Sequence, residues 1–333
     1  MTKKRESRIT VQTALNRFIK HQEARKKLKP STLASYKTIG NRLRAHFSEQ
    51  YLKDVTALDI EYLLNVVLIE PSQMKGLGYN TKTRKNTRSF LKLMFAHFYK
   101  NRDINQTPFA MGIRLDEFDD SQFILPYEND EVRAVLALRD GSGIVEGFSV
   151  AVFEGLRPGE LLGLTARNYD PEVGILEIEK SVCLNHIKAP KNNGSKRRLK
   201  ITNATKSLLD QSLSSNQFEE REIKLHRDNR DVETFTDKFF FYKSDDGSCW
   251  GDSKNFCAKL ATYFDKAGVV FRGLQPARHT FITNAVNGGL SFEEVALHAG
   301  HNNTVTLKRN YLYWTKHIIG KGNLDMRNLH CTF

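Results

Sequence analysis

The chain has 333 residues, with 51 Lys and Arg against 38 Asp and Glu, a formal net charge of +13. This length predicts about two domains, each able to bury its own core. No apolar run approaches the ~20 residues of a membrane span, and residues 1–10 (MTKKRESRIT) lack the apolar core of a signal peptide. The four cysteines have neither CxxC nor metal-ligand spacing, so we expect a cytoplasmic protein with reduced thiols and no metal site.

The positive charge is concentrated in the first third of the chain. Residues 1–110 contain 22 Lys and Arg against 8 Asp and Glu, whereas residues 111–333 contain 29 against 30. A basic module of this kind suits double-stranded DNA, because neutralising phosphates releases counterions and supplies most non-specific affinity. A basic surface that serves only solubility is the alternative.

Four helices are predicted in this basic region. The first covers Val11–Arg25, the second begins at Pro30, the third begins near residues 56–59 and the fourth covers residues 80–100. Apolar residues recur at helical spacing in the second and fourth: Tyr36, Ile39, Leu43 and Phe47, then Leu91, Met94, Phe95 and Phe98. We therefore expect a helical first domain.

Basic residues lie off these apolar stripes and are candidate DNA contacts. On the fourth helix they are Lys82, Arg84, Lys85, Arg88 and Lys92, and on the second they are Lys37, Arg42 and Arg44. A basic face opposite an apolar one can lie along a DNA groove or backbone. For one helix alone, a solvated charged face explains the pattern equally well.

Residues 105–123 contain proline, glycine and the acidic run LDEFDD, which interrupt the helical periodicity. We place a first domain at residues 1–112, a linker at 113–125 and a second domain at 126–333.

The second domain is predicted to begin with helices at residues 128–139 and Ile144–Glu154. A tight turn with the sequence GLRPGELLGL then leads into another helix, and strands follow at residues 175–182 and 198–202. Between the strands lies a hairpin tip rich in cations, residues 188–198. Helices are expected from there on, interrupted by a buried apolar run at residues 239–242.

Two arginines occupy similar positions in this domain, each at the start of a helical stretch. Arg157 is followed three residues later by Glu160, whose carboxylate can hold a guanidinium or cap the helix, and Arg278 follows Pro276. Two arginines that converge can bind one phosphate through paired hydrogen bonds and neutralise its transition-state charge. Taken singly, each arginine more often forms a structural salt bridge.

The motifs GLRPGELLGL, PKNNGSKRR, PARHTF and AGHNN, followed by a tyrosine near the C-terminus, occur in that order. This set is similar to the tyrosine recombinase (phage integrase) family, and the resemblance covers nearly the whole chain. It implies a mainly α fold with a small antiparallel sheet, arranged as a two-domain clamp. The first domain would be a helical core-binding domain and the second a mixed α+β catalytic domain that needs no cofactor.

The resemblance also assigns the phosphate-binding residues. Arg157 and Arg278 match the two clamp arginines, Glu160 matches the acidic residue that supports the first, and His301 matches the hydrogen-bond donor to the scissile phosphate. Gln275 stands where the family usually has histidine. Glutamine can bind a phosphate oxygen but cannot exchange protons as the general base of the family does.

Two assignments leave alternatives open. Lys191 matches the lysine that protonates the departing 5′-oxygen, with Lys188 and Lys196 as alternatives on the same hairpin. Tyr311 matches the nucleophile that forms a 3′-phosphotyrosyl intermediate. Its spacing from the preceding histidine is one residue longer than usual in the family, and Tyr313 is the alternative nucleophile.

The implied function is site-specific recombination by a homotetramer on two DNA sites, serving integration and excision of a mobile element or resolution of replicons. Accessory DNA-bending proteins are candidate partners, residues 320–333 are expected to dock on a neighbouring protomer, and no membrane is involved. With only a short segment ahead of the first helix, we expect no additional arm-binding domain. The alternative is a catalytically silent DNA-binding protein of the same fold, and a type IB topoisomerase would share the chemistry.

Overall fold

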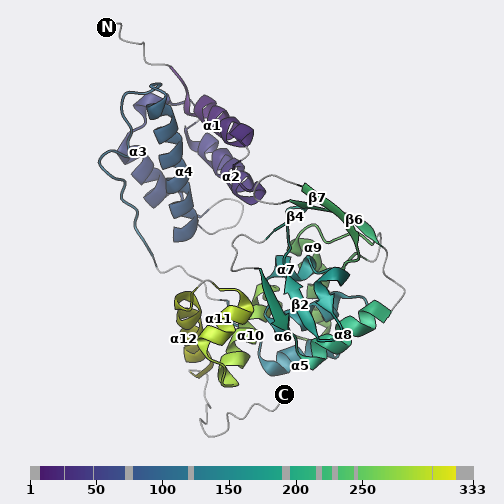
Figure 1. Ribbon diagram of the computed structural model, residues 1–333. Coiled ribbons are helices and arrows are strands. Elements are labelled where there is room, and N and C mark those ends of the chain that lie inside the picture. The colour runs from purple at the N-terminus through teal and green to yellow at the C-terminus, as the bar shows by residue number, and fades with distance from the viewer. Residues whose placement is uncertain are drawn as a thin grey trace. The chain divides into compact units, whose positions relative to one another are not determined.

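The computed structural model describes residues 8–25, 27–47, 49–71, 78–118, 124–189, 196–214, 220–226, 232–243, 247–301 and 303–319. The chain divides into two compact units, Met1–Gln122 and Phe123–Phe333 (Figure 1). Within the described ranges, no helix is both long and apolar enough to cross a membrane.

The described part of the first unit is helical. Its elements are α1 (Val11–Arg25), α2 (Pro30–Phe47), η1 (Leu52–Asp54), α3 (Ala57–Tyr62), the π-helical turn η2 (Leu63–Val67) and α4 (Thr81–Lys100). The local sequence explains two of the starts. Thr56 and Asp59 form a capping box at α3, and the Asn80 side chain accepts a hydrogen bond from the Thr83 amide at 2.9 Å at α4. The four predicted helices are confirmed.

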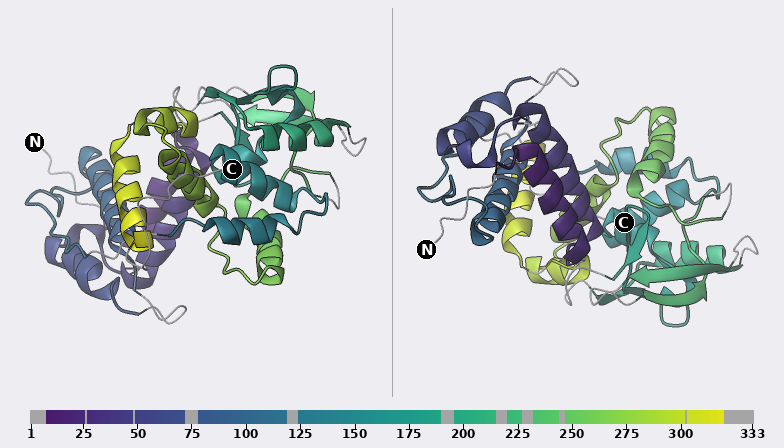
Figure 2. Two further views of the ribbon diagram at one scale, coloured as in Figure 1. Left: turned by 90° about the horizontal axis from the view of Figure 1, so that it is seen from below. Right: turned by 90° about the horizontal axis from the view of Figure 1, so that it is seen from above.

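The core of the first unit follows the predicted apolar stripes. Leu43 of α2 and Met94 of α4 are completely buried, and Phe18 of α1 packs edge-on against Phe90 of α4 with ring centroids 5.5 Å apart. Helices α1 and α2 lie side by side, as the right-hand view of Figure 2 shows. Tertiary packing of these faces supplies most of the stability of such helices.

Part of the segment predicted as a linker packs onto the first unit. Ile113 is buried in its core. The Asn65 side chain donates to the Arg114 carbonyl at 3.1 Å and accepts from the Asp116 amide at 3.0 Å. Residues 113–118 therefore belong structurally to the first unit.

The second unit combines helices with two small sheets. Its helical elements are α5 (Asn129–Leu136), α6 (Ile144–Glu154), α7 (Pro158–Leu162), η3 (Ala166–Asn168), α8 (Asn203–Ser214), α9 (Ser253–Lys266), α10 (Gln275–Asn287), α11 (Phe292–Ala299) and α12 (Val305–Ile319). Its strands are β1 (Tyr169–Asp170), β2 (Ile175–Ile178), β3 (Ser181–Cys183), β4 (His186–Lys188), β5 (Arg197–Lys200), β6 (Arg221–His226) and β7 (Val232–Asp237).

The sheets differ from the expected single antiparallel sheet. One sheet, in the order β1-β2-β5, is antiparallel, whereas the other, β3-β4-β6-β7, contains a parallel β4–β6 pair. The predicted strand over residues 175–182 is wrong as a single element, because β2 and β3 belong to different sheets. Between them the Lys180 side chain turns inward, and its amine donates to the Thr165 hydroxyl at 2.8 Å.

Strands β6 and β7 were not expected, since helices were predicted throughout this region. Their register pairs Ile223 with Phe235, and on β6 only Ile223 and Leu225 are buried between charged, solvent-facing neighbours. The apolar run at residues 239–242 is largely buried, as predicted, but its residues form only isolated bridges such as Thr165 with Phe239. The mainly helical fold class is confirmed, with a mixed sheet added.

Helix α6 runs through the core of the second unit and ends beside the candidate site. Most of its residues are buried, and Gly155 ends it with a positive φ of 62°. A Cβ at Gly155 would lie 2.3 Å from the Phe281 ring, so this turn requires glycine. The last three helices, α10, α11 and α12, lie together in Figure 1, and their buried side chains, Trp314 among them, form a separate apolar cluster.

Candidate active site

Arg157 is positioned by the turn between α6 and α7. It is the N-cap of α7, with Pro158 in the first turn and Glu160 at the third position. The Arg157 amide donates to one Glu160 oxygen at 3.0 Å, and its Nη1 donates to the other at 2.6 Å. The local sequence RPGE therefore builds a guanidinium–carboxylate pair at a helix start, as predicted.

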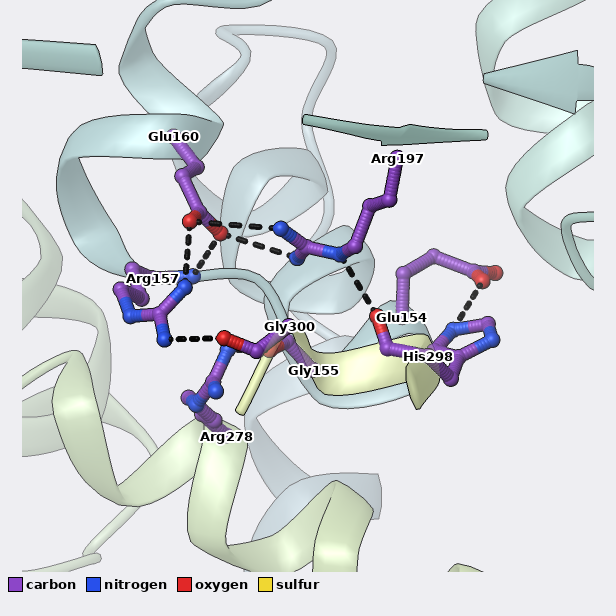
Figure 3. Close-up of polar contacts among 8 residues, drawn as sticks. All are labelled: Glu154, Gly155, Arg157, Glu160, Arg197, Arg278, His298 and Gly300. Atoms are coloured by element: carbon purple, nitrogen blue, oxygen red, sulfur yellow. Dashed lines mark hydrogen bonds and ion pairs between the residues drawn. The ribbon is translucent and has the colours of Figure 1, made fainter. Parts of the chain in front are cut away.

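Glu160 is the centre of a larger ionic cluster (Figure 3). Its side chain is buried, and a second arginine, Arg197 at the start of β5, donates from Nη2 to Glu160 Oε2 at 3.0 Å. Burial opposes ionisation of this carboxyl, but the positive charges of Arg197 and Arg157 outweigh it and lower its pKa. Glu160 is therefore ionised and holds two guanidinium groups.

Both arginines also bind the C-terminal end of α11. Arg197 Nε donates to the His298 carbonyl at 2.6 Å, and Arg157 Nη2 donates to the Gly300 carbonyl at 2.7 Å (Figure 3). Carbonyls at a helix C-terminus lack intrahelical partners and carry partial negative charge, which favours cations. Gly300 has a φ of 69°, and His301 follows it directly, with its amide bonded to the Ala296 carbonyl at 2.8 Å.

Arg278 brings another positive charge to the cluster from the first turn of α10. Its side chain is 2% exposed, and its Nη1 donates to the Gly155 carbonyl at 2.7 Å. Its Nη2 is buried without a hydrogen-bond partner among the described residues. Burial and the neighbouring Arg157 lower the pKa of Arg278 to about 9. The charge of this side chain is therefore incompletely compensated.

His301 is the second group in the cluster with an unsatisfied polar atom. Its Nε2 is buried and has no partner in the described part of the chain. Burial, together with Arg278, Arg157 and Arg197, lowers its pKa to about 4. His301 is therefore neutral at neutral pH. A buried cation and a neutral imidazole, each with an unused polar atom, form a site suited to a tetrahedral oxyanion.

The remaining predicted clamp and hairpin residues are placed as follows. Gln275 is exposed and begins α10, three residues before Arg278. Lys191 lies outside the described residues. Of its two alternatives, Lys188 is half-buried at the end of β4 and Lys196 is exposed just before β5.

Tyr311 on α12 is held by its own helical cluster. Its hydroxyl donates to the Asn287 side chain at 2.8 Å, and its ring packs edge-on against Phe292 with centroids 5.3 Å apart. Burial raises the pKa of its hydroxyl. Tyr313 also packs against this cluster. The structure thus brings together Arg157, Glu160, Arg278 and His301, and engages the Tyr311 hydroxyl with Asn287.

Two other histidines beside the cluster are part of the packing. His279 packs on Trp314 with ring centroids 4.5 Å apart, and burial followed by the charge of Arg278 lowers its pKa to about 4. His298 stacks on Phe281, and its Nε2 lies 3.5 Å from a buried Glu154 oxygen. In the described part of the chain, no group of His, Cys, Asp and Glu is arranged to hold a metal ion.

One predicted DNA contact is wrong. Arg84 is completely buried, and its guanidinium donates to the Leu64 carbonyl at 3.3 Å and to the Thr81 hydroxyl at 3.1 Å. It also lies over the Phe118 ring. Arg84 therefore links α4 to η2 and to the segment around residue 118, and it is inaccessible to DNA.

The other candidate DNA contacts are at least partly exposed. Lys82 and Lys92 are exposed and Arg88 is half-buried. The rest make contacts within the unit: Lys85 pairs with Glu117 at 2.7 Å, Lys37 pairs with Glu23 at 3.0 Å, Arg42 lies 3.8 Å over the Tyr79 ring, and Arg44 donates to Asn16 at 2.7 Å. Exposed ion pairs of this kind contribute little to stability.

Sequence reasoning missed Arg197, which was treated only as one of several hairpin cations. A signal was present in the alternation of β5. Side chains two residues apart in a strand share a face, and Leu199 is buried whereas Arg198 and Lys200 are exposed. Arg197 therefore had to face inward, where a buried guanidinium needs a carboxylate.

The chain resembles proteins of known function. It is 25% identical over 244 residues to a protein from Caldanaerobacter subterraneus subsp. tengcongensis described as "Tyrosine recombinase XerC-like". That match covers 68% of this chain and 61% of the relative, so the chain spans about three fifths of the relative's length. No protein-family model matches the sequence.

Two solved structures share the fold. The Tn1549 transposon integrase in complex with a circular intermediate DNA matches with a TM-score of 0.71 and 18% identity, covering 94% of this chain and 99% of that one. A lambda integrase dimer bound to a COC′ core site matches with a TM-score of 0.65 and 15% identity, covering 91% and 95%. At these identities the likeness establishes the fold alone.

Proposed function

The chain belongs to the tyrosine recombinase (phage integrase) family, and from this premise we propose that it is a site-specific DNA recombinase or integrase. It cleaves and rejoins DNA strands through a 3′-phosphotyrosyl intermediate. The observation that carries the proposal is the pair of unsatisfied atoms beside Arg157, which are Arg278 Nη2 and His301 Nε2. Burying a cation that has an unused hydrogen-bond donor costs folding free energy unless an anion binds to that donor.

The scissile phosphate is that anion in our proposal. Arg157 and Arg278 bind its non-bridging oxygens and neutralise the charge that grows on them in the transition state. His301, neutral because of its lowered pKa, supplies a hydrogen bond and adds no charge to the cluster. Gln275 binds a phosphate oxygen but takes no proton, because an amide is not a base.

Tyr311 is the nucleophile in this mechanism. Its hydroxyl releases its proton to water and its oxygen forms a bond to phosphorus as the bond to the 5′-oxygen breaks, and Lys191 gives a proton to that departing oxygen. The 5′-hydroxyl of a partner strand reverses the attack and releases the tyrosine. Since the hydroxyl of Tyr311 donates to Asn287, this bond must break before attack.

In the proposed clamp, one unit binds DNA and the other carries out the reaction. Within residues 1–112, the basic face of α4 with Lys82, Arg88 and Lys92 binds the DNA backbone, and residues 126–333 carry the chemistry. The neighbours with this fold support DNA as the partner, since a lambda integrase tetramer with a TM-score of 0.66 was solved on a Holliday junction. We propose the same tetrameric assembly here, acting on the nucleoid in the cytoplasm.

The assembly has two further proposed elements. Residues 320–333, which lie outside the described residues, dock on a neighbouring protomer, and accessory DNA-bending proteins assist where the DNA site requires bending. The biological task is integration and excision of a mobile element or resolution of replicons.

A catalytically silent DNA-binding protein of the same fold is the second candidate. Two observations favour it: Gln275 replaces the usual histidine, and Asn287 holds the Tyr311 hydroxyl. The arginine cluster opposes it, because a silent protein has no need to keep a buried guanidinium incompletely paired.

The experiment uses DNA flanking the gene as a nicked suicide substrate, with a denaturing gel to detect a covalent protein–DNA adduct. Wild type, Tyr311→Phe and Tyr313→Phe are compared. An adduct lost only in Tyr311→Phe supports the proposal, and loss only in Tyr313→Phe moves the nucleophile. Tight binding without adduct in wild type, with adduct restored by Gln275→His, establishes the silent protein.

A further inference from the structure

Arg197 is a deeply buried cation to which the proposed mechanism gives no role. Its side chain is 5% exposed, compared with 37% for Arg157. Its nitrogens point to two acceptors on different elements: the Glu160 carboxylate of α7 and the His298 carbonyl of α11. Figure 3 shows this guanidinium between the two. One side chain of β5 thus joins the elements that carry Arg157 and His301.

The contacts of Arg197 are parallel to those of Arg157. Both arginines bind Glu160, and both bind a carbonyl at the C-terminal end of α11, at His298 and at the C-cap Gly300. The approach is close, since a Cβ at Gly300 would lie 2.8 Å from Arg197 Nη1. Any movement of Arg197 therefore displaces the turn that leads into His301.

We propose that Arg197 is a positioning residue for the phosphate site: it fixes the Glu160 carboxylate that orients Arg157 and anchors the α11 turn that presents His301. The proposal rests on the recombinase function proposed above. Arg197 is not itself a phosphate ligand, because its guanidinium is buried and donates to Glu160 and to the His298 carbonyl. Preorganising the groups that meet developing charge is a major source of catalytic rate.

The geometry requires arginine and not merely a positive charge. Nε and Nη2 of Arg197 donate in diverging directions, at 2.6 Å to the His298 carbonyl and 3.0 Å to Glu160. A lysine ammonium has a single nitrogen and cannot present the planar fork that serves both acceptors. Arg197→Lys therefore keeps the charge and removes the bridge.

The matched control is the neighbouring residue on the other face of the same strand. Arg198 is exposed and lies opposite Glu177 in the register of β2 and β5. Arg197→Lys and Arg198→Lys both conserve the charge and lie at adjacent positions of β5. Comparing them distinguishes the loss of the buried hydrogen bonds of Arg197 from a general effect of substitution in the strand. Adduct formation on the nicked suicide duplex and binding to a random duplex are measured for each.

We expect Arg197→Lys to form adduct about 100-fold more slowly than wild type, the loss typical of a small misplacement of catalytic groups. Its affinity for random duplex stays within about twofold, because the buried group makes no part of the phosphate-neutralising surface. Arg198→Lys behaves as wild type. A folded Arg197→Lys protein that forms adduct at the wild-type rate overturns the proposal.

Two further readouts separate positioning from a structural effect. If Arg197 acts through Glu160, the losses of Arg197→Lys and Glu160→Gln are not additive in the double variant, and additive losses count against the proposal. Independently of any DNA, the pKa of His301 measured by NMR rises in Arg197→Ala, because one of the charges that lower it is removed. An unchanged His301 pKa contradicts the link from Arg197 to His301.

The experiments distinguish a failure of the positioning proposal from a failure of the proposed recombinase function. If wild type forms no adduct, the proposed function fails, while the His301 titration still tests the link. If wild type forms adduct and the Arg197 variants match it, only the positioning role fails.

Discussion

Arg278 donates one end of its guanidinium to the Gly155 carbonyl at 2.7 Å and buries the other, Nη2, without a partner in the described chain. The carbonyl comes from the residue that ends α6, two positions before Arg157. The turn that presents one clamp arginine therefore also holds the other. The arrangement explains why the two cations, 121 positions apart in the sequence, lie close enough for Arg157 to lower the pKa of Arg278.

Replacing Arg278 should separate activity from stability. In Arg278→Met we expect adduct formation to fall by about 100-fold or more, since a preorganised donor to the phosphate is lost. The free energy of unfolding should stay within about 1 kcal/mol of wild type or rise, because a buried, incompletely paired charge is replaced by an apolar chain of similar length. Urea unfolding and the adduct assay measure the two effects.

Arg272→Met is the control, since Arg272 donates to both Glu131 oxygens, with Nη1 2.9 Å from Oε1. Its loss should lower the free energy of unfolding by about 2 kcal/mol. If Arg278→Met destabilises the protein as much as Arg272→Met does, the charge of Arg278 is compensated and the anion site loses its main support.

The two buried histidines predict how stability depends on pH. Burial is the main cause that lowers the pKa of His301 to about 4, and the neighbouring arginines add to it. Burial also lowers the pKa of His279 to about 4. The unfolded state takes up these protons near pH 6.5, before the folded state does. Stability from both groups is therefore fully present above about pH 6.5 and is lost as the pH falls towards 4.

The measurement is the free energy of unfolding in urea at pH 7.5 and pH 5.0, for wild type, His301→Gln and His279→Gln. Each variant should show a smaller loss between the two pH values than wild type, because one titrating group is gone. A wild-type protein as stable at pH 5.0 as at pH 7.5 would contradict the lowered pKa values.

Replacing Arg84 should affect the stability of the first unit, whereas replacing Lys82 should affect its binding to DNA. Arg84→Ala removes a fully buried side chain and leaves the Leu64 carbonyl without its donor, so we expect a loss of about 3 kcal/mol in unfolding free energy. Lys82→Ala changes an exposed residue and should leave stability nearly unchanged. It should instead reduce the slope of log affinity against log salt for random duplex by about 0.9.

Fluorescence anisotropy over a range of salt concentrations measures the slope, and urea unfolding measures stability. An unchanged slope in Lys82→Ala would remove Lys82 from the DNA-binding face. A stable Arg84→Ala protein would show that the buried network around Arg84 is dispensable.

Asn287 should control how readily Tyr311 reacts. The hydrogen bond from Tyr311 to Asn287 must break before attack, and a bond of this kind contributes about 0.5–1.5 kcal/mol. Asn287→Ala should therefore speed adduct formation by roughly 2- to 10-fold. The rate of adduct formation under single-turnover conditions is the measurement, with Tyr313→Phe as a control that keeps the Asn287 bond. Slower cleavage in Asn287→Ala would mean that Asn287 supports the reactive position.

The sequence by itself determined the features that depend on neighbouring residues. Helical periodicity predicted α2 and α4, since apolar residues at 3.6-residue spacing form one face whatever packs on it. The pairing of Arg157 with Glu160 was also predictable, because three positions bring side chains together at a helix start. The ordered motifs pointed to the family without any structural information.

Only the tertiary structure decided which side chains meet across the chain. It buried Arg84, which helical spacing had placed with the basic residues, and it turned Arg197 inward to Glu160 and the end of α11. It also placed the Tyr311 hydroxyl on Asn287, 24 positions earlier in the chain. These contacts depend on how distant elements pack, and the burial and partners of a charged side chain follow from that packing and not from local periodicity.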